Sequence, residues 1–283
     1  MNNIQPKNPP KMKLHQISTI LIFLLAMSCT EKAPAKTEQS TENVIKTETV
    51  SYNINGKNYR SFVAFKDRSD AARPVVMVIP EWWGLNDYAK DRAKQLAELG
   101  YLAMAVDIYG DGKTVDNPAD AQKLADPFYQ NPVSSKAIFD GAKTQILKFD
   151  QADSTKIAVI GYCFGGAQAL NMARQESSLK GAVSFHGNLM TGVKPQNNKV
   201  PLLICNGADD SFVPKEEIAA FKKEMDSAHI KYTFIDYPNA IHSFTNPTST
   251  AVGKKFNMKV AYNNEANEKS WKDMKAFFDE IFK

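Results

Sequence analysis

Nearly continuous apolar runs alternate with amphipathic segments along most of this chain, and this alternation restricts its fold more than any other feature. The apolar runs are typical of strands buried on both faces of a sheet, and they occupy 73–84, 101–110, 156–166, 180–187 and 200–210. Segments with helical spacing of apolar residues lie between and after them, at 86–100, 134–149, 167–175, 215–228 and 267–282. This order predicts an α/β fold, with a mainly parallel sheet covered by helices on both faces.

Three further segments complete the expected elements. Asn55-Gly56 separates two β-rich runs within 48–65 and predicts a hairpin turn. A short helix is expected at 118–126, inside a loop-rich excursion, and a last strand at 231–240. The chain has 283 residues, of which 43% are hydrophobic, so one domain at 49–283 can bury a full core.

The first 28 residues have the pattern of a bacterial signal peptide of the lipoprotein type. Lys11 and Lys13 precede an apolar run at 17–27 that is too short to span a bilayer. Cys29 follows after Ser28 and is the expected lipidation site, which predicts a protein anchored in the cell envelope. A plain secretory signal is the alternative. Residues 29–48 are polar, without apolar periodicity, and are interpreted as a flexible tether.

The overall composition argues against several classes of partner. The net charge is only +4 and the second half of the chain has no basic block, so no nucleic-acid binding is expected. The three cysteines, Cys29, Cys163 and Cys205, form neither a disulfide framework nor a zinc-binding pattern. The sequence calls for no metal or organic cofactor, and a monomer is expected.

The segment "GYCFGG" joins a predicted strand to a predicted helix and places Cys163 at a sharp turn. Gly161 and Gly165 flank the cysteine in the pattern of a nucleophile elbow, which needs small neighbours because strand and helix approach closely there. The amino end of the following helix favours a thiolate at this position. Alternatively, small residues simply allow the chain to turn.

A thiol nucleophile needs a base and an acid, and parallel strands collect their polar carboxyl ends at one edge of the sheet. The polar residues expected at that edge are Glu81, Asp107, Cys163, His186, Asp209, Asp210 and His242. The order nucleophile, acid, histidine selects His242 as the base, because His186 precedes either aspartate of the pair Asp209 and Asp210. His229 is expected at the opposite edge. Spacing alone does not choose between the two aspartates.

Five motifs, "PEWWGLND", "DIYG", "GYCFGG", "GADDSFVP" and "IHSF", occur in the order and spacing of the dienelactone hydrolase family. The chain resembles this family, which has the α/β-hydrolase fold, over residues 60–283. The resemblance implies Cys163 as nucleophile, Asp210 as acid and His242 as base. It also implies that Glu81 helps to generate the thiolate, and that the backbone N–H groups of Phe164 and Trp82 form the oxyanion hole. The implied activity is hydrolysis of a lactone or small carboxylic ester.

The sequence departs from the family where a substrate carboxylate would be held by arginines. Thr245 and Asn246 follow the histidine, and 108–148 contains no arginine. Lysines in that region (Lys113, Lys123 and Lys136) lack the planar fork of arginine. We therefore expect a substrate other than dienelactone, with Trp83 and His186 lining its pocket. A non-catalytic ligand-binding lipoprotein and a redox protein that pairs Cys163 with Cys205 are the alternative hypotheses.

Overall fold

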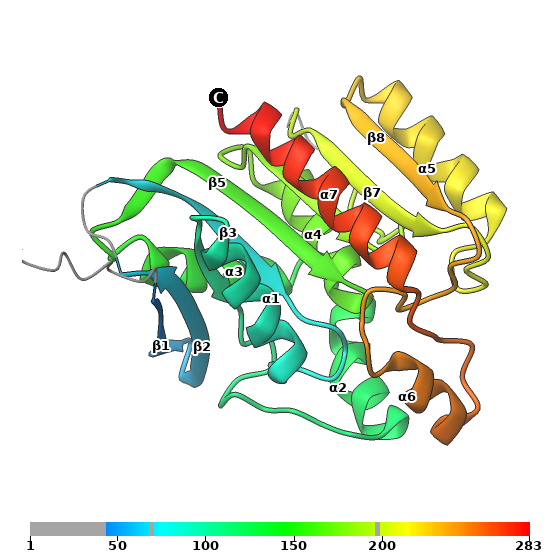
Figure 1. Cartoon of the computed structure of the whole chain (residues 1–283), viewed down its shortest axis with the longest axis horizontal. Coiled ribbons are helices and arrows are strands. Elements are labelled where there is room, and N and C mark those ends of the chain that lie inside the picture. Colours follow the sequence, from blue (N-terminus) through cyan, green and yellow to red (C-terminus); the bar gives the residue numbers. More distant parts are fainter. Residues whose placement is uncertain (1–43, 68–70, 196–198) are drawn as a thin grey trace, which may run out of the picture. The chain divides into compact units, whose positions relative to one another are not determined.

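The computed structural model describes residues 44–67, 71–195 and 199–283, which build one eight-stranded sheet in the order β1-β2-β4-β3-β5-β6-β7-β8 (Figure 1). Strands β3 to β8 run parallel, while β1 and β2 are antiparallel additions at one edge. This confirms the predicted mainly parallel sheet. The strands are β1 (Ile45–Ile54), β2 (Lys57–Lys66), β3 (Arg73–Ile79), β4 (Leu102–Ala105), β5 (Ala152–Tyr162), β6 (Gly181–Phe185), β7 (Leu202–Gly207) and β8 (Tyr232–Tyr237).

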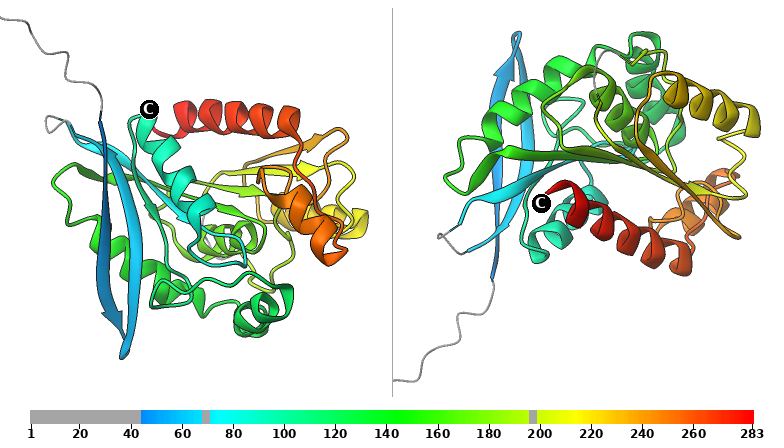
Figure 2. Two further views of the ribbon diagram at one scale, coloured as in Figure 1. Left: turned by 60° about the horizontal axis from the view of Figure 1, so that its bottom comes forward. Right: turned by 90° about the horizontal axis from the view of Figure 1, so that it is seen from above.

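Helices cover both faces of the sheet, as Figure 2 shows. Helices α1 and α7 lie on one face, and α3, α4 and α5 lie on the other. The helices are α1 (Asp87–Glu98), α2 (Pro118–Gln130), α3 (Ser135–Ile146), α4 (Phe164–Gln175), α5 (Lys215–Ser227), α6 (Ser249–Phe256) and α7 (Asn264–Ile281). Within the described ranges, none of the helices combines the length and the apolar character needed to cross a membrane.

Two hydrophobic cores fill the space between the sheet and its helices. Successive side chains of a strand point to opposite faces, so Val75 and Met77 of β3 enter the core under α3, α4 and α5. Val76 and Val78 enter the core under α1 and α7. All four are fully buried, which explains why the strand is a continuous apolar run rather than an alternating one.

The predicted hairpin is present, with Asn55 and Gly56 at φ 51° and 82° between β1 and β2. The predicted domain start at Thr49 is too late, because β1 begins at Ile45. The residues Lys46 to Thr49 are exposed and pair with β2 through their backbone, so they carry no apolar signal. Helix α6 was not predicted. The signal peptide, Cys29 and most of the tether lie outside the described residues.

Candidate active site

Cys163 occupies the turn between β5 and α4, where its backbone has φ 54° and ψ −121°. A Cβ at Gly161 would lie 1.9 Å from the carbonyl oxygen of Gly165, and one at Gly165 would lie 2.2 Å from that of Ile79. Both glycines are therefore required by close backbone contacts. The turn holds the half-buried thiol of Cys163 at the carboxyl end of the central strand, in the geometry of a nucleophile elbow.

His242 connects the thiol to a buried carboxylate. Its Nε2 lies 3.1 Å from Cys163 Sγ, and its Nδ1 lies 2.8 Å from Asp210 Oδ2. The backbone N–H of Phe212 donates to the other oxygen of Asp210 at 2.8 Å, which fixes the carboxylate. Asp209 is exposed, whereas Asp210 is buried, so the structure brings only Asp210 of this pair to the histidine. His229 is exposed between α5 and β8, at the other edge of the sheet.

The environment of His242 favours its protonated form. Burial on its own disfavours the charged ring, but the negative charge of Cys163 and the hydrogen bonds to Asp210 and Cys163 outweigh this effect. Together they raise the pKa of His242 to about 10. The rings of Phe212 and His186 pack against the imidazole with centroid distances of 4.9 and 5.3 Å. The arrangement is suited to a thiolate and imidazolium ion pair.

His186 does not line the pocket, contrary to the expectation from the sequence. It follows β6 with φ 41°, and this backbone turns its ring behind Cys163, where it is only 1% exposed. Its Nδ1 accepts a hydrogen bond from the backbone N–H of Cys163 at 3.1 Å, and its Nε2 lies 2.7 Å from Thr245 Oγ1. Burial and the charges of His242 and Arg92 hold the pKa of His186 well below its usual range. His186 is thus a neutral ring that contacts the backbone of the elbow.

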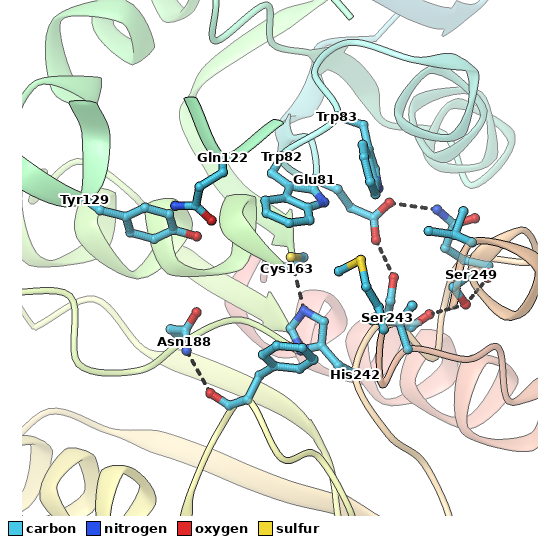
Figure 3. Close-up of a pocket in the computed structure, with 15 residues that line it drawn as sticks. Glu81, Trp82, Trp83, Gln122, Tyr129, Cys163, Asn188, His242, Ser243 and Ser249 are labelled. Atoms are coloured by element: carbon cyan, nitrogen blue, oxygen red, sulfur yellow. Dashed lines mark hydrogen bonds between the residues drawn. The ribbon is translucent and has the colours of Figure 1, made fainter. Parts of the chain in front are cut away.

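Glu81 lies after β3 and is 2% exposed. Its oxygens accept hydrogen bonds from Ser243 Oγ at 2.6 Å and Asn246 Nδ2 at 2.7 Å, both in the segment that carries His242. Burial raises the pKa of Glu81, and these two hydrogen bonds oppose that effect. The carboxyl group therefore ties the β3 loop to the loop of the histidine (Figure 3).

The two backbone groups expected to form an oxyanion hole have fixed peptide planes. Phe164 is the first residue of α4, so its N–H has no acceptor within the helix. The peptide that carries the Trp82 N–H is oriented by the carbonyl of Glu81, which accepts from Gly84 N–H at 3.1 Å. The Trp82 carbonyl in turn accepts from the hydroxyl of Tyr109 at 3.0 Å.

A cavity of about 190 Å³ opens above Cys163 (Figure 3). Trp83 lines it, as expected, together with Glu81, Trp82, Gln122, Tyr129, Cys163, Asn188, Phe212, His242, Ser243, Asn246, Ser249, Val252, Met258 and Val260. Sequence reasoning missed its walls from α2 and from α6 with the following loop. Outside those walls two lining residues had a signal, since Phe212 lies in "GADDSFVP" two positions after Asp210 and Ser243 lies in "IHSF" directly after His242.

The remaining candidates lie away from this site. Lys113, Lys123 and Lys136 are absent from the lining of the cavity. Cys205 on β7 is fully buried and unpaired, and burial raises the pKa of its thiol to about 12. Cys163 is likewise a free thiol. Across the described ranges, His, Cys, Asp and Glu side chains form no group that could hold a metal ion.

The parallel sheet and the elbow at the end of β5 define an α/β hydrolase. The profile of the family described as "Dienelactone hydrolase family" matches residues 60–282, and the chain belongs to this family. The solved structure named m3DLH matches with a TM-score of 0.78 and 32% identity, covering 84% of this chain and 98% of its own. A dienelactone hydrolase-like promiscuous phosphotriesterase from metagenomic libraries matches with the same TM-score, identity and coverage.

Curated relatives agree with this assignment. Protein usf of Aquifex pyrophilus is 30% identical over 203 residues, which are 70% of this chain and 86% of the relative. The "Putative carboxymethylenebutenolidase" of Escherichia coli (strain K12) is 27% identical over 201 residues, which are 67% of this chain and 74% of the relative. The chain is accordingly a dienelactone hydrolase-like hydrolase.

Proposed function

We propose that this protein cleaves a lactone or a small carboxylic ester by acyl transfer, with Cys163 as nucleophile, His242 as base and Asp210 as the acid that orients it. The observation that carries the proposal is the contact of 3.1 Å between Cys163 Sγ and a His242 ring whose far nitrogen is fixed by Asp210. A nucleophile, a base and an orienting carboxylate within hydrogen-bond reach are the parts that covalent acyl transfer needs.

In the first half of the reaction, the thiolate of Cys163 attacks the carbonyl carbon and forms a C–S bond, while the C=O π electrons move to oxygen. The N–H groups of Phe164 and Trp82 hold this oxyanion, an effect worth about 3–4 kcal/mol per donor at such sites. The C–O bond to the leaving group then breaks, and the departing oxygen takes the proton from Nε2 of His242. A thioester on Cys163 and a neutral histidine remain.

In the second half, His242 accepts a proton from a water molecule as the water oxygen attacks the thioester carbon. The second tetrahedral adduct collapses, the C–S bond breaks, and the carboxylic acid leaves. Cys163 returns as a thiolate beside a protonated His242. Asp210 keeps the imidazole in one orientation throughout. Glu81 is proposed to act on the thiol indirectly, because its hydrogen bonds go to Ser243 and Asn246 of the histidine loop.

The test uses the purified full chain with p-nitrophenyl acetate and a panel of lactones, including dienelactone. A phosphotriester is added to the panel because one related structure is described as a phosphotriesterase. Cys163→Ala is expected to abolish turnover of esters and lactones, since no other group would carry the acyl intermediate. Cys205→Ala is the matched control, because Cys205 is buried on β7, and it is expected to retain turnover.

Turnover that survives in folded Cys163→Ala would contradict the nucleophile assignment. Saturable ligand binding without turnover by the wild type would instead favour the alternative, a ligand-binding protein on the same fold. We further propose that the chain is a lipoprotein attached to a bacterial membrane through Cys29 and works there as a monomer. That proposal is based on the sequence pattern of the first 48 residues.

A further inference from the structure

We propose that the catalytic cavity accepts uncharged, apolar acyl groups and rejects acyl groups that carry a carboxylate. The inference rests on the proposed function, since the acyl group of an intermediate bonded to Cys163 Sγ must extend into the space above the thiol. That space is the cavity of about 190 Å³, and Cys163 belongs to its lining. The character of the cavity wall therefore decides which acyl groups fit.

The cavity wall offers a substrate anion no positive charge that is not already paired. None of the residues that line it in the described structure is a lysine or an arginine. His242 is the one cationic side chain, and its two nitrogens already face Cys163 and Asp210. The wall also contains the carboxyl group of Glu81. A substrate carboxylate in this space would lose its hydration and lie near negative groups without a compensating partner, which is unfavourable.

Two buried or half-buried cationic side chains, those of Arg92 and Lys136, are committed to structural contacts. Arg92 on α1 is 6% exposed, and its guanidinium donates to Tyr88 OH, to the Thr245 carbonyl at 2.7 Å and to Asn267 Oδ1 at 2.6 Å. Lys136 on α3 is paired with Asp140 and Glu176. Neither side chain lines the cavity. Moving Arg92 would break buried hydrogen bonds, and moving Lys136 would break half-buried ion pairs.

Much of the remaining wall is apolar surface that comes from two directions, while Gln122, Tyr129 and Asn188 add polar side chains. Trp82 and Trp83 follow β3 and pack edge to face, with ring centroids 5.1 Å apart. Val252, Met258 and Val260 come from α6 and the loop after it. This second group is fixed relative to the base, because Val260 forms a β-bridge with His242 and the next residue donates its N–H to the His242 carbonyl at 3.2 Å. The backbone of the loop after α6, which carries part of the apolar wall, is thus hydrogen-bonded directly to the backbone of the catalytic histidine.

A matched pair of esters tests the proposal on the full-length protein. The p-nitrophenyl esters of 4-methylpentanoic acid and of succinic acid have acyl groups of nearly the same shape, but the second ends in a carboxylate where the first has an isopropyl group. The rate of Cys163→Ala is subtracted as background. We expect the neutral ester to have a kcat/KM at least about tenfold higher, because the anion would be buried without a counter-ion.

Met258→Lys places a positive charge on the cavity wall, and lysine is unbranched like the methionine that it replaces. This variant is expected to lower the ratio of kcat/KM for the neutral ester to kcat/KM for the succinate ester by about fivefold or more. Val252→Lys is the second variant if Met258→Lys does not fold. Leu99→Lys adds the same charge at an exposed position outside the cavity, and its ratio is expected to equal that of the wild type.

A wild-type ratio near one, or a preference for the succinate ester, would overturn the inference while leaving the esterase function intact. Failure to cleave either matched ester, with Cys163-dependent cleavage of p-nitrophenyl acetate retained, would also overturn it, because the cavity would then not take such acyl groups. Absence of cleavage of every ester would instead remove the proposed function itself.

Discussion

Three residues of the site, Cys163, His186 and Ser243, have positive φ angles of 54°, 41° and 63°. This region is costly for residues with a side chain, and it persists where the surrounding structure fixes the backbone. Cys163 directly follows β5, and His186 directly follows β6. Ser243 directly follows His242, which forms a β-bridge with Val260. The strained turns aim the thiol, the supporting ring and the hydroxyl that holds Glu81.

The two histidines near Cys163 are expected to contribute unequally. His242→Ala removes the proposed base and is predicted to lower kcat/KM by about 10³-fold or more. His186→Ala removes one hydrogen bond to the Cys163 backbone, which is worth about 1 kcal/mol, and is predicted to lower kcat/KM by roughly fivefold.

Steady-state kinetics on both variants checks the prediction. His186→Asn is the control, because its side-chain oxygen can accept the same N–H, and it should recover part of the loss if His186 is a positioning residue. Equal losses in the two alanine variants would mean that His242 is not the only base.

We expect the proposed ion pair between Cys163 and His242 to be visible in the alkylation of the thiol. Because the pKa of His242 is raised to about 10, the ring stays protonated at pH 6 and can stabilise a thiolate there. Iodoacetamide is therefore expected to alkylate Cys163 faster at pH 6 in the wild type than in His242→Ala, by about tenfold or more. Mass spectrometry of the alkylated peptide provides the measurement. Equal rates at pH 6 would show that the histidine does not support the thiolate.

The grouping of site residues could be predicted where the signal is local. The sequence shows the glycines around Cys163 and the order of Cys163, Asp210 and His242 along the chain. The partners of Glu81 were not predicted, because Ser243 and Asn246 lie more than 160 positions away along the chain and meet it only through the fold. The prediction that His186 lines the pocket was wrong for a related reason. Its φ of 41° turns the ring away from the cavity, and no sequence pattern predicts that angle.

At the scale of elements, Glu176 at the end of α4 joins this helix to α3. Its carboxylate accepts from Lys143 at 2.8 Å and Lys136 at 3.1 Å. Burial opposes the charged form, but the hydrogen bonds from Lys143, Ser178 and Lys136 prevail and lower the pKa of Glu176 to about 2. The contact therefore links α4, which begins directly after Cys163, to its neighbour α3.

The lowered pKa of Glu176 sets a pH window for its contribution to stability. The pKa is lower in the folded state, so the stabilisation is present above about pH 4.5 and is lost as the pH falls toward about 2. Glu176→Gln is predicted to reduce the free energy of unfolding at pH 7 by roughly 1 kcal/mol, a value kept small because the group is partly solvated. Urea unfolding at pH 7 and at low pH tests this. A difference between wild type and variant that grows on acidification would contradict it.

Elements were predictable where burial is deep and continuous. The strands from β3 to β7 were found because their apolar runs are long. Helix α6 was missed because its eight residues, "STAVGKKF", contain a glycine and only a short apolar stretch. Its position depends on Gly253, where a Cβ would lie 2.3 Å from the Val260 carbonyl oxygen. This packing contact cannot be predicted from the helix propensity of the local sequence.

At the scale of the whole molecule, the parallel sheet explains why residues distant in sequence share one site. Glu81, Cys163 and Asp210 each follow a parallel strand, and the carboxyl ends of such strands meet at one edge. The alternation of strands and helices predicted this edge correctly. The cavity wall was not predictable, because its shape comes from α2 and α6, which lie outside the alternation.

The last prediction concerns the attachment of the whole molecule to a membrane. If Cys29 is lipidated, full-length protein expressed in a bacterium should partition into the detergent phase of a Triton X-114 separation, because two or more acyl chains anchor a protein stably. Cys29→Ser is expected to move it to the aqueous phase. Its ester turnover per mole should be unchanged, since the candidate catalytic residues all lie beyond residue 80. Wild-type protein recovered in the aqueous phase with a mature end other than Cys29 would instead indicate a plain secretory signal, and the hydrolase would then act free of the membrane.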